Sequence, residues 1–448
     1  MKKKTVYIVH NIDTEGPLYE SLDATFDRIK EMTGHSINPT KENLQKLQKK
    51  QMKLDGDEEK IFRMLSSGRI KTHHTWEQID NMLDEITSIS YRNKVLDSYG
   101  GGWIYNWLCM SHIGFTGINP RKRDIGYYNI YDHYTKYFQK KNDRSDLIQW
   151  HYHSLSITND AHRCGSTYLN SSHIYDILSR YIINRSWFPS VFRAGHNTIR
   201  PDSNFFLEQW IPFDFSNSNF IKAPNPESSS RFGDWRQAPK SWIPYHPSHD
   251  NYQIPGNCKR LIARCAPIND RAYSISFEDV CQAFEEANNN EASILSVTNH
   301  DFREMSPDIE IVRNLLLKCK HKYPHINFKF SNAIDAIRSV FKMDKISEVE
   351  FNVYLKKYNS YKKLIIETNN DIFGTQPFLA LKTKNNKYYW QNLDFESKNV
   401  WSYSFDVYNV LLEQVDKIGI AANTSTGLTE IVNFNPNSEK KRTTILNK

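Results

Sequence analysis

The sequence predicts an α/β fold in which a barrel-like or doubly wound parallel sheet covers about residues 1–340. Two observations lead to this fold class. Strand-like runs alternate with helical patterns five or more times, and residues capable of chemistry follow the strands each time. Size adds a third observation, because 448 residues are too many for one ordinary hydrophobic core. We therefore expect a large α/β domain and a second, smaller domain.

The first strand is predicted at residues 5–9, an uncharged run of β-branched and aromatic residues. Asp13 and Glu15 follow it. Residues two apart on an extended chain share a face, and parallel α/β sheets place their chemistry at the carboxyl ends of the strands. Gly16 and Pro17 then turn the chain away. For this pair alone, the alternative is a loop aspartate beside a solvated glutamate.

A second short strand is predicted at residues 146–153, where His151 and His153 alternate with Tyr152. Their imidazoles can then converge on one side of the strand. One carboxylate with two imidazoles is a common open metal shell that leaves room for water and substrate. Buried structural histidines are the alternative. A strand-end histidine pair in the same chain as a strand-end acid pair favours the metal site.

Two later strands also end in polar residues. Residues 191–196 are a mostly apolar run that contains the charged Arg193. This arginine could pair with a surface acid, or it could hold a base carboxylate ionised and oriented. Residues 292–297 form the last strand of the series, and His300 and Asp301 follow its end. The chemical residues of several strands are therefore expected at one edge of the sheet.

Composition limits the partners. The formal net charge of +7 comes from 58 basic and 51 acidic residues. This mild excess permits an anionic substrate such as a nucleotide- or phosphate-linked sugar, but the charges are too widely spread for a nucleic-acid groove. Aromatic residues make up 13% of the chain, which suits stacking on sugar rings and equally suits an aromatic-rich core. Composition therefore predicts no nucleic-acid partner and leaves both interpretations of the aromatic residues open.

The sequence also predicts where the protein works. No window is apolar enough to span a membrane, and the apolar run after residues 1–4 ends too early for a secretory signal. The six cysteines include no C-x-x-C pair and are interpreted as reduced thiols. A cytoplasmic protein is therefore expected.

The texture of the sequence changes beyond Ser347, where tyrosines and lysines alternate with apolar residues. We predict a barrel domain at residues 1–345, a small β-rich accessory domain at residues 346–435 and a loose basic tail at residues 436–448. A carbohydrate-facing module and a plain packing domain are both open interpretations of the accessory domain.

Five motifs in a fixed order carry a resemblance to a known family. The sequence resembles the polysaccharide deacetylases of the NodB-homology superfamily, and most closely the WbmS-like branch associated with bacterial lipopolysaccharide O-antigen synthesis. The motifs cover the first three quarters of the chain and are NIDTEGP at 11–17, QWHYH at 149–153, VFRAGH at 191–196, PFDFS at 212–216 and VTNHDFR at 297–303.

The resemblance implies a distorted (β/α) barrel that uses one divalent metal, with zinc as the expected ion, to remove acyl groups from N-acylated sugars. Carried over by position, the site residues are the general base Asp13, the acidic metal ligand Glu15, the histidine ligands His151 and His153, the base partner Arg193 and the general acid His300.

Two spacings depart from the common family form. That form has adjacent aspartates and histidines three or four apart, whereas here one residue separates the two carboxylates and one separates the two imidazoles. The division of labour between Asp13 and Glu15 therefore stays open. So does the choice of the histidine ligands, for which His10 and His162 are alternatives.

These expectations describe a metal-dependent hydrolase that removes an N-acyl group, in the simplest case N-acetyl, from a nucleotide- or lipid-linked glycan during bacterial surface polysaccharide or lipopolysaccharide synthesis. A carboxylate would take the proton of the attacking water, and a histidine would protonate the departing amine. Two alternatives remain: a non-catalytic carbohydrate-binding protein on a degenerate deacetylase barrel, and a metal hydrolase of another amide or ester.

Overall fold

The computed structural model describes the protein over residues 4–65, 72–113, 125–142, 145–158, 164–169, 173–219, 233–269, 273–346, 348–358 and 361–448. His162, one of the alternative histidine ligands, lies outside these residues. In the part of the chain that the structure describes, no helix combines the length and apolarity that crossing a bilayer requires.

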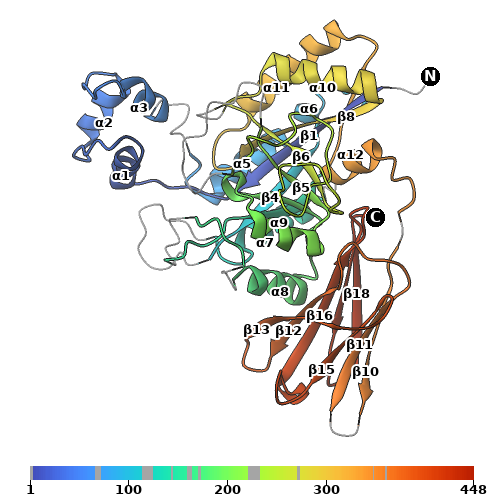
Figure 1. The fold of residues 1–448 in the computed structure, drawn as a ribbon. Coiled ribbons are helices and arrows are strands. Elements are labelled where there is room, and N and C mark those ends of the chain that lie inside the picture. Colours follow the sequence, from blue (N-terminus) through green and yellow to red (C-terminus); the bar gives the residue numbers. More distant parts are fainter. Residues whose placement is uncertain are drawn as a thin grey trace.

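Eight parallel strands form a nearly closed barrel, which confirms the predicted α/β class (Figure 1). Their order is β6-β5-β4-β3-β2-β1-β8-β7. β6 and β7 are consecutive pieces of one segment that pairs with β5 at its start and with β8 at its end, so this segment brings the two edges together. The strands are β1 (Thr5–Thr14), β2 (Tyr105–Ser111), β3 (Leu147–Tyr152), β4 (Val191–Ala194), β5 (Phe213–Asn217), β6 (Leu261–Arg264), β7 (Ala266–Pro267) and β8 (Ala292–His300).

The period of two in these strands divides their side chains between the barrel interior and the helical layer. Val9 and Val191 pack inside with α12 (Ala333–Val340), which lies near the amino ends of the strands. Ile8 and Phe192 belong to the larger cluster beneath the helices. Toward the carboxyl ends of the strands, the positions that point into the barrel carry the polar side chains of the predicted site, Asp13, His151, Arg193 and His300.

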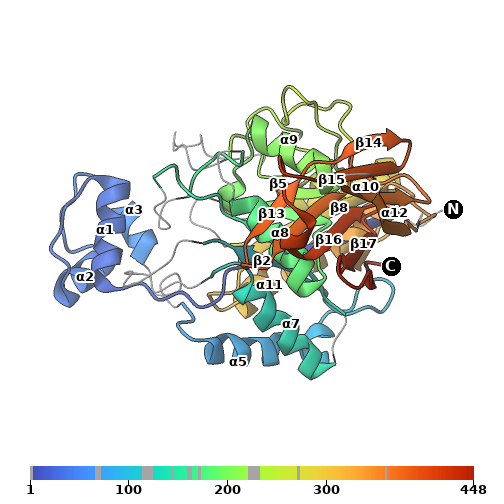
Figure 2. The ribbon, with the colours of Figure 1, turned by 90° about the horizontal axis from the view of Figure 1, so that it is seen from below.

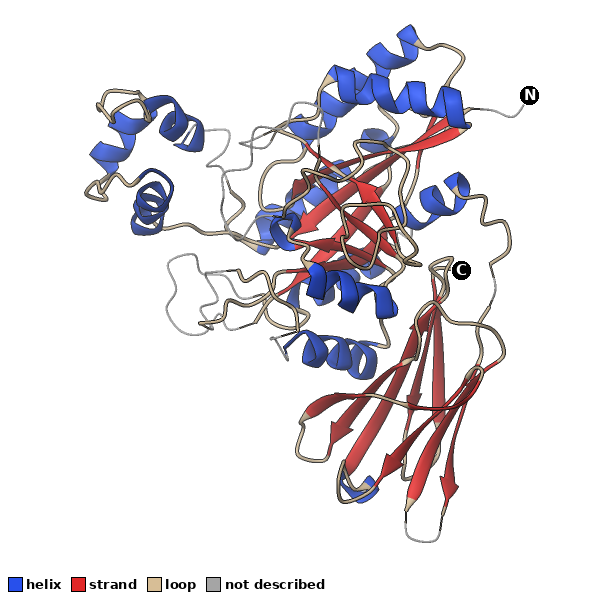
Figure 3. Cartoon of the chain, viewed as in Figure 1, coloured by secondary structure: helices blue, strands red, loops and turns tan. Residues whose placement is uncertain are grey.

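Helices alternate with the strands and cover the barrel (Figure 3). Another short strand, β9 (Asn327–Phe330), pairs with the first residues of β1. The helices of this layer are α5 (Trp76–Ile86), α6 (Ile89–Arg92), α7 (Asn129–Lys141), α8 (His173–Arg185), α9 (Pro201–Trp210), α10 (Phe277–Asn290) and α11 (Ser306–Lys322).

An insertion of three helices follows the turn at the end of β1. Its helices are α1 (Leu22–Thr33), α2 (Lys41–Gln48) and α3 (Glu58–Leu65). They bury a small apolar cluster of their own, which includes Phe26, Leu47 and Ile61. Figure 2 shows the insertion standing apart from the barrel. Because the insertion buries only this small core of its own, it can form helices and still carry many polar residues.

The C-terminal part is rich in β-strands, as its sequence texture predicted, and the strands form two antiparallel sheets. One has the order β10-β11-β15-β14 and the other β13-β12-β16-β17-β18. The strands are β10 (Phe351–Lys357), β11 (Lys362–Thr368), β12 (Phe378–Thr383), β13 (Tyr388–Gln391), β14 (Asp394–Ser397), β15 (Val400–Phe405), β16 (Val415–Asn423), β17 (Thr429–Phe434) and β18 (Lys441–Leu446).

The last strand corrects the prediction of a loose basic tail. Residues Lys441–Leu446 form β18, which pairs with β17 along its whole length. Thr443, Thr444 and Ile445 are good strand formers. The backbone hydrogen bonds between β18 and β17 also order Lys441 and Arg442 at the start of β18. Charge alone was therefore a poor guide to disorder here.

The five-stranded sheet packs directly on the barrel. Phe378 and Ala421 belong to the same apolar cluster as Phe188 and Trp210 of the barrel. The side-chain amide of Asn423 donates to the backbone carbonyls of Pro189 and Trp210, at 2.7 Å each. One face of the five-stranded sheet therefore shares the buried core of the barrel. Its other face and the four-stranded sheet enclose a separate apolar cluster, which includes Leu364 and Ile420.

Candidate metal and catalytic site

The turn after β1 forms the first side of the site. Asp13 is 5% and Glu15 6% exposed, so both carboxylates are buried. Gly16 adopts a φ of 68°, and a Cβ added there would overlap Ile130 and approach Trp76. Glycine tolerates this left-handed conformation without steric cost. It allows the chain to turn sharply while both carboxylates stay at the carboxyl end of the barrel.

Asp301 fixes this turn in place. Its carboxylate accepts the backbone N–H of Glu15 at 2.7 Å, that of Gly16 at 2.9 Å and the hydroxyl of Tyr134 at 2.8 Å. Burial raises the pKa of Asp301 to about 6, against the opposing effect of these donors. Sequence reasoning gave Asp301 no role. Its one signal was its position directly after His300, at the end of the last barrel strand.

Arg193 forms a buried ion pair with Asp13. Its Nε donates to Oδ1 of Asp13 at 2.8 Å, and its Nη1 donates to the backbone carbonyl of Phe215 at 2.7 Å. Burial lowers the pKa of Arg193, but the combined effects of Asp13, Cys265 and Asp214 outweigh burial, so the pKa is raised. The guanidinium therefore stays charged and occupies one oxygen of Asp13.

The two histidines of β3 face each other. Nε2 of His151 and Nε2 of His153 are 3.0 Å apart. Nδ1 of His151 lies 2.9 Å from the backbone carbonyl of Arg193. A carbonyl oxygen only accepts, so Nδ1 carries the hydrogen and Nε2 keeps a lone pair. Burial lowers the pKa of His151 and favours this neutral ring.

Glu15 completes a donor set with these imidazoles. Its Oε1 lies 3.9 Å from Nε2 of His151 and 3.7 Å from Nε2 of His153. Zinc ligands at bond lengths of about 2.1 Å in a tetrahedron lie about 3.4 Å apart, and the three separations of 3.0, 3.7 and 3.9 Å span this value. The buried set of Glu15, His151 and His153 could thus hold one metal ion. It contains Glu15 and not Asp13.

His300 lies at the mouth of the same space. It is paired in register with Asp13 on the neighbouring strand. Its Nε2 lies 3.9 Å from Oδ2 of Asp13 and 3.8 Å from Oε1 of Glu15. The side chain is 35% exposed, whereas the carboxylates beside it are buried. The structure therefore brings all six predicted site residues together, with His300 nearest to solvent.

His10, the other alternative ligand, does not belong to the site. Its Nδ1 accepts a hydrogen bond from Trp103 at 3.1 Å, and its Nε2 lies 2.9 Å from the amide oxygen of Asn299. Burial lowers the pKa of His10 to about 4, so the ring is neutral. Both ring nitrogens are engaged on the outward side of β1, which identifies His10 as a core histidine.

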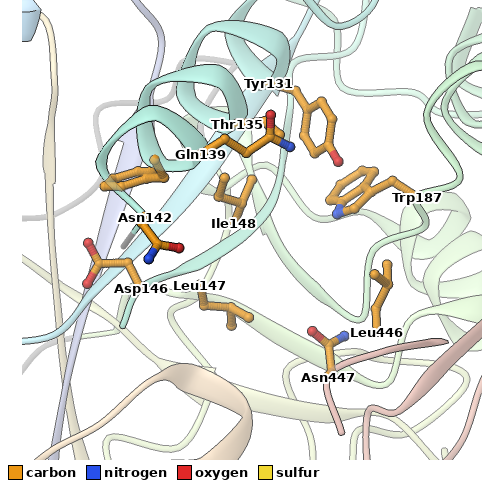
Figure 4. A pocket seen from close by; sticks show the side chains of 11 residues that line it. Tyr131, Thr135, Gln139, Asn142, Asp146, Leu147, Ile148, Trp187, Leu446 and Asn447 are labelled. Atoms are coloured by element: carbon orange, nitrogen blue, oxygen red, sulfur yellow. The ribbon is translucent and has the colours of Figure 1, made fainter. Parts of the chain in front are cut away.

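A cavity of about 380 Å³ lies elsewhere in the molecule (Figure 4). It is bounded by α7, the start of β3 and the residues around the end of β18, with Tyr131 and Trp187 in its wall. Asp146, also in the wall, is bound by both terminal nitrogens of Arg92. None of the six site residues lines this cavity. It is therefore separate from the metal donors.

Neither a protein-family model nor a curated protein sequence matches the chain.

Proposed function

We propose that this protein is a metal-dependent hydrolase that removes an N-acyl group, in the simplest case N-acetyl, from a sugar. The observation that carries the proposal is the convergence, at one end of a parallel barrel, of the Glu15–His151–His153 donor set with the buried Asp13–Arg193 pair. A structural metal site needs only the donors. Hydrolysis also needs groups that accept and donate protons. The Asp13–Arg193 pair and the partly exposed His300 can supply them.

Glu15, His151 and His153 would hold the ion in this proposal. A divalent ion bound there supplies Lewis-acid polarisation of the acyl carbonyl and acidifies a water molecule. The donor set, one carboxylate and two imidazoles, suits zinc and its neighbours. It also leaves coordination positions for water and substrate, as hydrolytic sites require.

Asp13 is placed to act as the general base. Arg193 occupies its Oδ1, and its Oδ2 faces the site, 3.9 Å from Nε2 of His300. That oxygen can take the proton of the attacking water. The ion pair holds the Asp13 carboxylate in place and fixes the direction of its second oxygen.

His300 is placed to act as the general acid. As the new carbon–oxygen bond forms and the carbon–nitrogen bond breaks, the departing amine needs a proton, which Nε2 of His300 can supply. The products are a carboxylate and a free amine on the sugar. The exposure of His300 allows it to regain its proton from solvent. Separate residues thus accept and donate the protons.

The sugar substrate is supported by the family resemblance, in which the five motifs occur in family order. We place the reaction in the synthesis of bacterial surface polysaccharide or lipopolysaccharide, on a nucleotide- or lipid-linked glycan in the cytoplasm. The net charge of +7 agrees with a phosphate-bearing carrier.

A direct assay tests this proposal. Purified full-length protein, with its metal content measured, is incubated with a panel of N-acetylated nucleotide sugars and lipid-linked glycans, and acetate release is followed. Matched O-acetylated sugars form the control series. We expect release from N-acetylated members, loss on chelation and recovery with zinc. Release from O-acetylated members alone would make the protein an esterase, and a protein that binds the glycans without cleaving them would be a carbohydrate-binding protein.

A further inference from the structure

His153 belongs to a second group of metal-ligating side chains. One donor atom each from His153, Cys164 and His196 lies within 4.8 Å of the other two. Nδ1 of His153 is 3.0 Å from Sγ of Cys164. The rings of His153 and His196 have centroids 4.9 Å apart. The first donor set uses the opposite nitrogen of His153, Nε2.

The backbone fixes this second group in place. The segments of Leu155 and Cys164 form an antiparallel bridge, and the N–H of Gly165 donates to the carbonyl of Ser154 at 2.8 Å. On the other side, Gly195 lies directly against the His153 ring, because an added Cβ would overlap it. The donors are therefore presented by constrained chain segments on both sides of His153.

Cys164 is also the accessible thiol of this chain. None of the six cysteines forms a disulfide, and Cys164 is the one among them that is not buried. His196 is likewise partly exposed, whereas Glu15 and His151 are buried. A cation from solution can therefore reach the sulfur and His196. Thiolate and imidazole together favour thiophilic ions of the zinc type.

The two histidines of β3 differ in what holds their Nδ1. His151 faces a carbonyl oxygen, which only accepts, so its tautomer is fixed. His153 faces a sulfur, which can accept a hydrogen bond, donate one, or bind a metal. A neutral imidazole has one N–H and one lone pair. The ring of His153 can therefore offer its lone pair to one of the two donor sets at a time.

From these contacts we infer that His153, Cys164 and His196 form a second site for a thiophilic divalent cation, and that occupying it empties the first. An ion there binds Nδ1 of His153 and the sulfur, and the thiol proton leaves to solvent. The hydrogen of the His153 ring then sits on Nε2 and points at Glu15 and His151. The inference rests on the proposed metal centre, and it makes excess zinc an inhibitor of that centre.

Cadmium titration of the full-length protein tests the site. Metal-free protein receives Cd²⁺, and the ultraviolet sulfur-to-cadmium charge-transfer absorption is recorded. We expect one cadmium–thiolate per chain. Cys164→Ser should show no such absorption, and Cys258→Ser, which removes a buried cysteine outside both donor sets, should show it unchanged. His196→Ala should weaken the cadmium affinity about tenfold or more. No absorption in the unmodified protein would overturn the site.

Mutual exclusion has its own measurement. Protein loaded with one zinc per chain is titrated with Cd²⁺, desalted and analysed for both metals. We expect zinc to leave as the thiolate absorption grows, with the total staying near one ion per chain. A total of two ions, with zinc retained, would refute the exclusion. Glu15→Gln should lose zinc binding at the first site and keep the cadmium–thiolate absorption.

These readouts are independent of turnover. If no acylated sugar is cleaved but cadmium displaces zinc through Cys164, the proposed function fails and the second site stands. If sugars are deacetylated and the absorption is absent, the second site fails and the proposed function stands.

Discussion

Nε of Arg193 lies 2.8 Å from Oδ1 of Asp13, and both side chains are almost completely buried. The backbone carbonyl of the same arginine accepts the Nδ1 hydrogen of His151 at 2.9 Å. One residue of β4 therefore engages the candidate base with its side chain and orients a candidate metal ligand with its backbone. This double contact separates the two carboxylates of the Asp-x-Glu motif into different environments.

Asp13 and Glu15 should respond differently to neutral isosteres. Asp13→Asn keeps the shape of the side chain and removes its basicity, so we expect retained metal and a fall in kcat of about 100-fold or more. Glu15→Gln weakens a ligand and should lose metal. Metal content and kcat of both variants are measured together. Loss of metal from Asp13→Asn with retention in Glu15→Gln would show that the two carboxylates have exchanged roles.

Removing the guanidinium should destabilise the protein strongly. Arg193→Gln leaves Asp13 buried beside no cation, and breaking a buried pair from one side costs about 3–5 kcal/mol. Urea unfolding in the presence of chelator measures this free energy without metal. Arg236→Gln is the matched control, because Arg236 forms an ion pair with Asp234 on the surface, where we expect no measurable change. Equal effects of the two substitutions would contradict a buried, structurally required pair.

A methyl group at position 195 should disturb the metal centre through His153. Gly195→Ala places a Cβ where the imidazole of His153 lies, so the ring must move, and we expect zinc affinity to fall about tenfold or more. Gly34→Ala is the control: its Cβ would meet no atom within 4 Å, and the backbone strain at its φ of 77° lies at the end of α1, away from the metal donors. Both variants are titrated with zinc by calorimetry. Unchanged affinity in Gly195→Ala would argue against His153 as a ligand.

Glu430 should make stability depend on pH. Burial raises the pKa of this β17 carboxyl to about 7, above its value in the unfolded chain, so the native state binds the proton more tightly. Stability is then greatest at low pH and is lost as the pH rises toward 7 and Glu430 ionises. We expect Glu430→Gln to have a higher Tm than the unmodified protein at pH 8, by a margin that shrinks toward pH 5.

Glu413→Gln, at an exposed position, is the control for this comparison and should track the unmodified protein at every pH. Thermal unfolding followed by circular dichroism supplies the Tm values. A margin for Glu430→Gln that is the same at pH 5 and pH 8 would show that the carboxyl does not titrate in this window.

Much of the fold could be read from the sequence, because the signals were local. The uncharged run of β1 and the alternation of strands with helices predicted a parallel α/β architecture, and the structure confirms it. The texture after Ser347 likewise predicted a β-rich part, which the structure shows to be two antiparallel sheets. The expected tail failed because β18 is ordered by its ladder with β17. A single edge strand has too little hydrophobic pattern to be predicted from its sequence.

The sequence by itself determined the chemistry available at each strand end. A period of two put Asp13 and Glu15 on one face of the extended chain, and did the same for His151 and His153. The nature of these donors already favoured a divalent ion. What such spacing cannot specify is which side chains from other strands approach, because those contacts depend on how the barrel closes.

The tertiary structure decided the roles within that set. Arg193 reaches Asp13 across 180 residues of sequence, and Glu15 is the carboxylate that lies within 4 Å of Nε2 of both imidazoles. Asp301, Cys164 and His196 enter only through folding, as the partner of the β1 turn and the neighbours of His153. The physical reason is that hydrogen bonds and metal shells act over about 3 Å, a distance that only the packed barrel sets between residues remote in the chain.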